Sequence, residues 1–212
     1  MLPNSTMMVA FLAASFVLAA TPGPGVLFIV TRTVSQGRVA GLASVGGVAL
    51  GNFGNAVGAS IGLAAIFAIS AAAFSIVKIL GACYLIYLGL TALRSRDIGA
   101  TSGDVPTVQI AKIFRDGFWV ALLNPKTAIF FAAFLPQFLE SSVPTIAQSV
   151  GLGTAFVLIA ASTDIAYVLA AATVAPAMNR IARGATFGRY ISATIFVGLG
   201  LFTAFSGNRV AK

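Results

Sequence analysis

The sequence predicts an all-α, polytopic membrane protein whose six transmembrane helices form two inverted repeats of three helices. Three observations predict it: the composition, six long apolar runs, and an interrupted helix at the start of each half. The chain is 58% hydrophobic and 8% charged, against about 45–50% and about 25% in an average soluble domain. With a mean hydropathy of +0.99, there is too little polar surface to coat a water-facing shell. We expect one transmembrane domain over residues 1–212, with repeats at about 7–93 and 117–206.

Each predicted span is justified by its length, because a bilayer core of about 30 Å needs about 20 mainly apolar residues per helix. The runs that meet this requirement lie at about 7–31, 41–64, 72–93, 117–138, 147–173 and 188–206. No Lys or Arg precedes Met8, and the first run continues to Val30, so we interpret it as a retained helix rather than a secretory signal. The segment Arg94–Asp116 is expected to be irregular, with its apolar residues from Val108 to Phe114 at the membrane interface.

The basic residues predict the orientation. Nine of them fall in alternate loops, whereas only Arg209 and Lys212 fall on the opposite side. The nine are Arg32, Arg38, Arg94, Arg96, Lys112, Arg115, Arg180, Arg183 and Arg189. The positive-inside rule then puts both termini outside, on the side of the membrane opposite the cytoplasm. These cations face anionic lipid, so the net charge of +8 does not indicate a nucleic-acid partner.

Two similarities between the halves predict the inverted repeat. Residues 81–92 of span three and 192–203 of span six share a spacing of Gly, Ala and Leu. Spans one and four are both interrupted by proline, at Thr21–Gly25 and Asn124–Lys126. Because each half has three spans, the second must enter the membrane in the opposite sense, as is typical of secondary transporters. The alternative is that these are coincidences common to any six-span protein.

The segment Pro22-Gly23-Pro24-Gly25 should break span one near the middle of the bilayer. A proline removes a backbone donor and clashes with the carbonyl four residues earlier. Broken backbone at that depth is tolerated only where it is buried in protein or lines a wet cavity. We therefore interpret these four residues as part of a substrate surface, with a simple packing kink as the alternative.

Asn124-Pro125-Lys126 interrupts span four in the same way and brings a charge to the midplane. Lys126 lies ten residues beyond Asp116, which is about 15 Å along a helix. Asp164 lies between two apolar runs of span five. An ionised residue at a helix centre costs about 2.5–3.5 kcal/mol on insertion scales, so a merely structural chain would avoid both. We expect Lys126 and Asp164 to lie close together and Asp164 to carry a proton; a fixed ion pair between spans four and five is the alternative.

Span two combines small and polar residues. Its glycines recur at a spacing that permits close contact with a neighbouring helix, within the protomer or across a homodimer; they are Gly47, Gly51, Gly54, Gly58 and Gly62. Asn52 and Asn55 lie among them and either face the cavity or pack against a helix. Lys78, near the outer end of span three, is expected to extend its ammonium to the interface.

The composition also argues against catalysis, metals and cofactors. The chain has no His and one Cys, Cys83, which removes imidazole chemistry, dithiol relays and most zinc sites. Aspartyl proteolysis needs two carboxylates, and Asp164 is the one acid that we place inside a span. We expect no enzyme, no metal and no cofactor. A passive channel or facilitator for small polar solutes needs the same broken helices and stays an alternative.

The motifs, taken together, resemble those of the LysE/RhtB amino-acid exporters from Phe11 to about Ser206. They are Thr21-Pro-Gly-Pro24, the glycine-rich second span, Gly81-Ala-Cys-Tyr-Leu-Ile-Tyr-Leu-Gly89, and Asn124-Pro-Lys126 followed by Phe130-Phe131 and Leu135-Pro-Gln-Phe138. Asp164 falls where RhtB-type members have an acidic residue, whereas Gly25 stands where many members have Asn. The resemblance implies export of amino acids or similar small metabolites from the bacterial cytoplasm, driven by the proton motive force.

Overall fold

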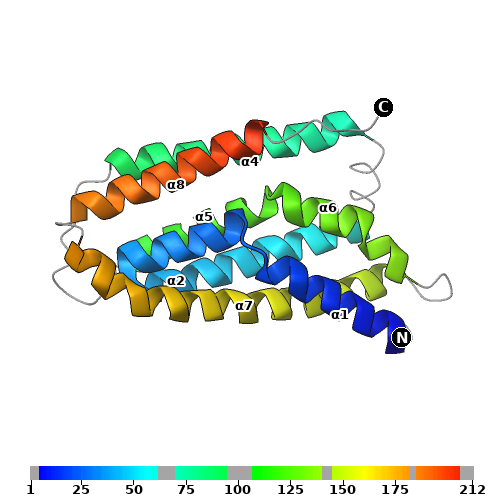
Figure 1. Ribbon diagram of the computed structural model, residues 1–212. Helices are drawn as coiled ribbons and strands as arrows, with labels where there is room; N and C mark the ends of the chain where they lie inside the picture. Colours follow the sequence, from blue (N-terminus) through cyan, green and yellow to red (C-terminus); the bar gives the residue numbers. More distant parts are fainter. Residues whose placement is uncertain (1–4, 62–69, 95–106, 140–144, 182–184, 206–212) are drawn as a thin grey trace.

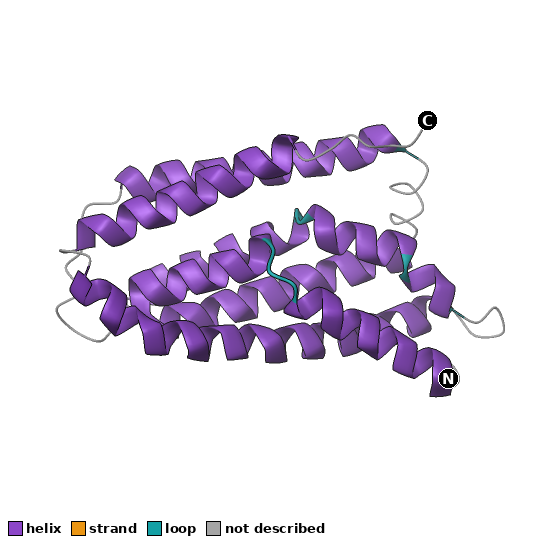
Figure 2. Cartoon of the chain, in the orientation of Figure 1, coloured by secondary structure: helices purple, strands orange, loops and turns teal. Residues whose placement is uncertain are grey.

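The computed structural model describes residues 5–61, 70–94, 107–139, 145–181 and 185–205. Within these ranges the chain is helical and contains no strand, which confirms the all-α prediction (Figure 2). The elements are α1 Ser5–Ala20, α2 Pro24–Ser60, α4 Ala71–Arg94, α5 Thr107–Leu122, α6 Pro125–Ala133, the 3-10 helix η1 Leu135–Phe138, α7 Thr145–Ile181 and α8 Ala185–Phe205. The expectations for Gly62, Arg96, Arg183, Arg209 and Lys212 concern residues outside the described ranges.

Helix α2 contains a reversal of direction at Gly37. This residue has φ 85° and ψ −179°, a conformation open to glycine because it has no Cβ. On either side of it the chain folds back on itself, since Gly41 lies against Thr33 and Gly25 lies against Val48. Figure 1 shows the two halves of α2, blue and cyan, running in opposite directions. The two halves correspond to the end of predicted span one and to predicted span two.

The helices form two groups (Figure 1). Helices α4 and α8 lie side by side, while α2 packs against α5 and α7, and α1 crosses α7. Contacts between α4 and α8 are reciprocal: Gly89 lies against Ala193 and Val197, and Gly200 lies against Ala82 and Ile86. These positions are the ones that the repeat equates, each 111 residues from its counterpart. Reciprocal contacts of this kind are typical of elements related by a two-fold axis.

Helix α5 begins at Thr107, about ten residues before the predicted start of span four at 117, so that boundary was wrong. Irregular structure was expected because of turn-forming residues that all precede the helix, namely Gly99, Ser102, Gly103, Asp104 and Pro106. From Thr107 on, the buried residues recur at helical spacing, at 113, 116, 117, 120 and 121. This face packs on the second half of α2. A Cβ at Gly47 or Gly51 would overlap the carbonyl oxygens of Phe114 and Phe118, so both glycines serve a close contact within the protomer.

Among the residues that the structure describes, two single helical stretches are long and apolar enough to cross a bilayer, namely Ser75–Arg94 and Ile146–Pro176. Two further candidates are bent pairs, α1 with α2 and α5 with the α6–η1 segment, each bent by 48° at its break. Counting each pair once raises the number to four, and Tyr190–Phe205 is a shorter apolar helix. The bends coincide with the two proline motifs.

Candidate functional site

The first break lies between α1 and α2. Pro22 and Pro24 have no N–H, so the carbonyls of Leu18 and Ala20, four residues before each, lose their usual helical donor. Leu18 O keeps only a 3.3 Å hydrogen bond from Thr21 N in the backbone. The break therefore presents carbonyl acceptors at the carboxyl end of α1.

Side chains from the second half of the chain donate to these carbonyls. Lys126 Nζ donates to Leu18 O at 2.7 Å and to Thr21 O at 2.5 Å. Tyr167 Oη, on α7, donates to Ala20 O at 2.8 Å. A cation at the carboxyl end of a helix is also favoured by the helix dipole. Lys126 thus stabilises the end of α1, across the break from its own helix.

The second break lies between α5 and α6. Asn124 is the N-cap of α6, because its Oδ1 accepts a hydrogen bond from Lys126 N at 3.1 Å. Pro125 deprives the carbonyl of Ala121, four residues earlier, of its helical donor. Ala121 O instead accepts from Asn124 N at 3.1 Å and from Asn55 Nδ2 at 2.9 Å. Asn55, for which the sequence left two interpretations open, therefore contacts a helix end.

A cavity of about 40 Å³ lies where the two breaks meet. Of the predicted site residues, it is lined by Gly23, Gly25, Asn52, Asn124, Lys126 and Asp164. Leu18, Ala19, Val26, Val48, Thr127, Phe156 and Ala160 complete the wall. The three prolines of the predicted site are not among the lining residues, and Pro22 is exposed. The volume is room for about three water molecules.

Asp164 is the carboxylate of this cavity and is only 4% exposed. In the part of the chain that the structure describes, its carboxylate has no hydrogen bond and no ion pair. It interacts electrostatically with Lys126, the cation of the same cavity. The two charges therefore share one cavity, but the ammonium is bonded to backbone carbonyls rather than to the carboxylate.

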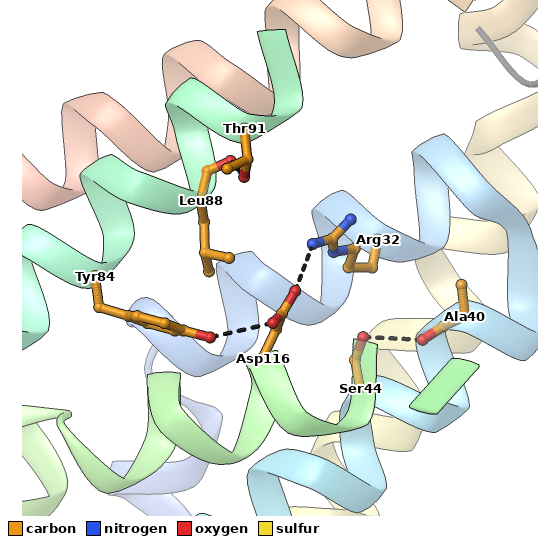
Figure 3. A network of polar contacts seen from close by, with 7 residues as sticks. All are labelled: Arg32, Ala40, Ser44, Tyr84, Leu88, Thr91 and Asp116. Atoms are coloured by element: carbon orange, nitrogen blue, oxygen red, sulfur yellow. Dashed lines mark hydrogen bonds and ion pairs between the residues drawn. The ribbon is translucent and has the colours of Figure 1, made fainter. Parts of the chain in front are cut away.

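A second polar cluster was missed in the sequence. Arg32 Nη2 contacts Asp116 Oδ2 at 3.2 Å, and Tyr84 Oη donates to Asp116 Oδ1 at 3.2 Å, which joins α2, α5 and α4 (Figure 3). The side chains of Arg32 and Asp116 are 16% and 3% exposed. We had placed both residues in loops, so the interpretation of Arg32 as a loop cation was wrong. The helical spacing of Asp116 with Ile113 and Val120 was the available signal.

Two further expectations need correction. Asp116 is a second buried acid within a helix that we treat as spanning, but it is bonded to Arg32 and Tyr84. Lys78 is 7% exposed, so its ammonium is not directed to an interface as expected. Within the described ranges, no group of three or more His, Cys, Asp or Glu side chains is placed to hold a metal ion.

Comparison with known proteins adds to this geometry. Residues 16–207 match the family described as LysE type translocator. A homoserine/homoserine lactone efflux protein of Salmonella typhimurium is 32% identical over 150 residues, 71% of this chain and 73% of that protein. A leucine efflux protein of Salmonella choleraesuis is 30% identical over 159 residues, 73% and 71% of the two chains. An uncharacterized membrane protein of Vibrio cholerae is 30% identical over 163 residues, 77% and 80%. No solved structure matches the chain.

Proposed function

The chain belongs to the LysE type translocator family, and from this premise we propose that it exports amino acids or related small metabolites from the bacterial cytoplasm by proton antiport. The observation that carries the proposal is the cavity between the two breaks, which holds a buried carboxylate without a hydrogen-bond partner among the described residues. Relatives named for efflux of homoserine, homoserine lactone and leucine support an amino-acid substrate.

The proposed topology has six passes, two inverted repeats and both termini in the periplasm of the inner membrane. The passes are α1 with the first half of α2, the second half of α2, α4, α5 with α6, α7 and α8. The reversal at Gly37 and the reciprocal contacts of α4 and α8 support this division. Exposed cations lie beside the reversal at Gly37, at the carboxyl end of α4 and in α5, and support a cytoplasmic face there; they are Arg38, Arg94, Lys112 and Arg115.

The proposed substrate and coupling residues are Pro22, Gly23, Pro24, Gly25, Asn52, Asn124, Pro125, Lys126 and Asp164. The prolines act through the backbone, because they create the helix ends that face the cavity. The amino-terminal ends of α2 and α6 offer amide donors to a carboxylate, and the unwound carbonyls offer acceptors to an ammonium group. An amino acid carries both groups.

Asp164 is the proposed proton carrier. A buried carboxylate without hydrogen bonds is costly when charged, which favours its protonated form. Asp164 takes up a proton from the periplasm and releases it to the cytoplasm, and each step changes the net charge of the cavity. Lys126 neutralises the carboxylate of Asp164 in one state of the cycle. In alternating access, the two repeats move relative to each other around this cavity and open it to one side of the membrane at a time.

The proposed export is tested by expressing the protein in an export-deficient bacterium loaded with dipeptides. Each amino acid in the medium is measured over time, with the empty vector as control and the amount of protein in the membrane verified. We expect one amino acid or a small group to accumulate outside. If none exceeds the vector control while the protein is present in the membrane, export of amino acids is wrong.

A passive channel for small polar solutes is the alternative, because it needs the same broken helices. Counterflow in proteoliposomes separates the two. The liposomes are loaded with an excess of unlabelled substrate, and labelled substrate is added outside. A carrier transiently concentrates the labelled substrate inside, whereas a channel only lets its concentrations on the two sides become equal.

A further inference from the structure

The carboxyl end of α1 already holds a primary ammonium group, supplied by the protein itself. Lys126 Nζ donates to two carbonyls, Leu18 O at 2.7 Å and Thr21 O. Pro22 deprives Leu18 O of its helical donor, and Thr21 lies beyond the end of α1. The two oxygens therefore form a small acceptor site whose chemistry suits an ammonium group, because each offers a partial negative charge and accepts an N–H.

Two other polar groups of the break already have partners. The carbonyl of Ala20 is taken by Tyr167 Oη at 2.8 Å. Thr21 Oγ1 donates to Val17 O at 2.6 Å. An incoming ammonium group can therefore reach the carbonyls of Leu18 and Thr21 only when Lys126 leaves them.

The cavity offers Lys126 a second position. Asp164 lines the same cavity, is nearly fully buried, and has no hydrogen bond or ion pair in the described part of the chain. It already interacts electrostatically with Lys126. Gly23 leaves the space in which the lysine side chain lies, since a Cβ there would come within 3.2 Å of Lys126 Cδ. The side chain of Lys126 thus has two sets of acceptors, the carbonyls at the end of α1 and the carboxylate of Asp164.

We infer that the carbonyls of Leu18 and Thr21 form the subsite for the ammonium group of the substrate, and that the ammonium group of Lys126 occupies this subsite when no substrate is bound. This inference rests on the proposed function for the identity of the substrate. A bound amino acid displaces Lys126, whose ammonium then pairs with Asp164. A solute without a primary ammonium group gains nothing at these carbonyls, so the subsite selects amino compounds over the corresponding hydroxy acids.

The test measures binding rather than transport, so that it does not depend on the proposed export. Purified wild-type protein, Lys126→Met and the control Lys112→Met, at an exposed cation of α5, are heated in detergent at constant ionic strength. The probes are propylammonium chloride and tetramethylammonium chloride, of which only the first carries N–H donors. Methionine keeps an unbranched apolar side chain, one heavy atom shorter than lysine, and has no N–H donor, so it vacates the subsite.

We expect propylammonium to raise the midpoint of thermal unfolding of Lys126→Met, with a half-saturating concentration about tenfold lower than in the wild type or in Lys112→Met. Tetramethylammonium should have no such effect in any of the three proteins. If the two probes act alike on Lys126→Met, the subsite is wrong. Lys126→Leu serves the same comparison if Lys126→Met does not yield folded protein, because leucine also has no N–H donor for the carbonyls.

Failure of the ammonium subsite and failure of the proposed amino-acid export give different results. Export without a propylammonium effect contradicts the subsite and leaves the transporter standing. A propylammonium effect in a protein that exports no amino acid supports the subsite and contradicts the proposed substrate.

Discussion

Pro22, Pro24 and Pro125 determine which backbone carbonyls at the breaks need hydrogen-bond donors from other segments of the chain. Each lacks an N–H and deprives the carbonyl four residues earlier of its helical donor. Side chains of other segments supply the missing donors: Lys126 to Leu18, Tyr167 to Ala20 and Asn55 to Ala121. In a bilayer an unsatisfied carbonyl costs several kcal/mol, so these bonds allow the helices to stay broken at that depth.

Gly23→Val should abolish transport without removing the protein from the membrane. A Cβ at this position would lie 3.2 Å from Lys126 Cδ, and the two methyl groups of valine would extend into the cavity. We expect the initial rate of export to fall more than about tenfold. The matched control is Gly198→Val, because a Cβ at Gly198 meets no atom within 4 Å. An export rate of Gly23→Val above half that of the wild type would contradict the assignment of Gly23 to the cavity wall.

Arg32→Met should lower the thermal stability of the purified protein more than Arg32→Met combined with Asp116→Asn. Removing one partner of a buried ion pair leaves an uncompensated charge, which costs about 3–5 kcal/mol where burial is complete. The cost here is smaller because Arg32 is partly exposed. In the double variant, the asparagine still accepts from Tyr84. Unfolding midpoints are compared with Arg38→Met, at an exposed cation; equal losses in the single and double variants would contradict the account.

The helices show which signals in the sequence were sufficient. Long apolar runs located α4, α7 and α8 to within a few residues over the apolar part of each helix, and the prolines located both breaks. Residues 107–116 were misjudged, because Lys112, Arg115 and Asp116 lower the local hydropathy although the segment is amphipathic. The ion pair between Arg32 and Asp116 offsets part of the cost of burying their two charges. Nothing in the sequence links these residues, which are 84 positions apart.

Tyr167→Phe and Asn55→Leu should each impair transport by the same mechanism, since each removes a donor from a helix end at a break. Tyr167→Phe leaves Ala20 O without its side-chain donor, which costs about 1–3 kcal/mol and disfavours the conformation in which the two breaks border the cavity. After Asn55→Leu, Ala121 O keeps its hydrogen bond from Asn124 N, so the penalty is smaller. We expect a loss of export of about tenfold in Tyr167→Phe and a smaller loss in Asn55→Leu, with a modest drop in the unfolding midpoint of each. Tyr87→Phe, at a tyrosine that is 55% exposed, is the control. Wild-type export by Tyr167→Phe would show that the bond to Ala20 is dispensable.

In the molecule as a whole, each half of the chain donates a side-chain hydrogen bond to the helix break of the other half. Asn55 of the first half donates to the break of the second half, and Tyr167 of the second half donates to the break of the first. The reciprocal glycine contacts of α4 and α8 follow the same pattern. The sequence could predict the two breaks, because the prolines that cause them are local features of the chain, whereas the inverted repeat stays a prediction. It could not predict which side chain serves which break, because that depends on how the halves meet.

The proposed orientation predicts that an alkaline phosphatase fused after Lys212 is active and that one inserted near Ser102 is silent. With Arg32 buried in an ion pair, eight of the nine counted cations remain against two at the opposite side, and the positive-inside rule still favours periplasmic termini. Activity is measured in intact cells with equal amounts of fusion protein. The reverse pattern would contradict the six-pass topology with both termini outside.

The central claim is that the cavity between the two breaks couples export to protons through Asp164. The most direct measurement compares wild type, Asp164→Asn and Asp164→Glu in proteoliposomes, with the amino acid identified by the export assay. Uptake is followed once under an imposed pH gradient and once as counterflow without a gradient. We predict that Asp164→Asn loses accumulation driven by the gradient but retains counterflow, whereas Asp164→Glu keeps part of both. Accumulation of substrate against its gradient by Asp164→Asn would show instead that Asp164 is structural.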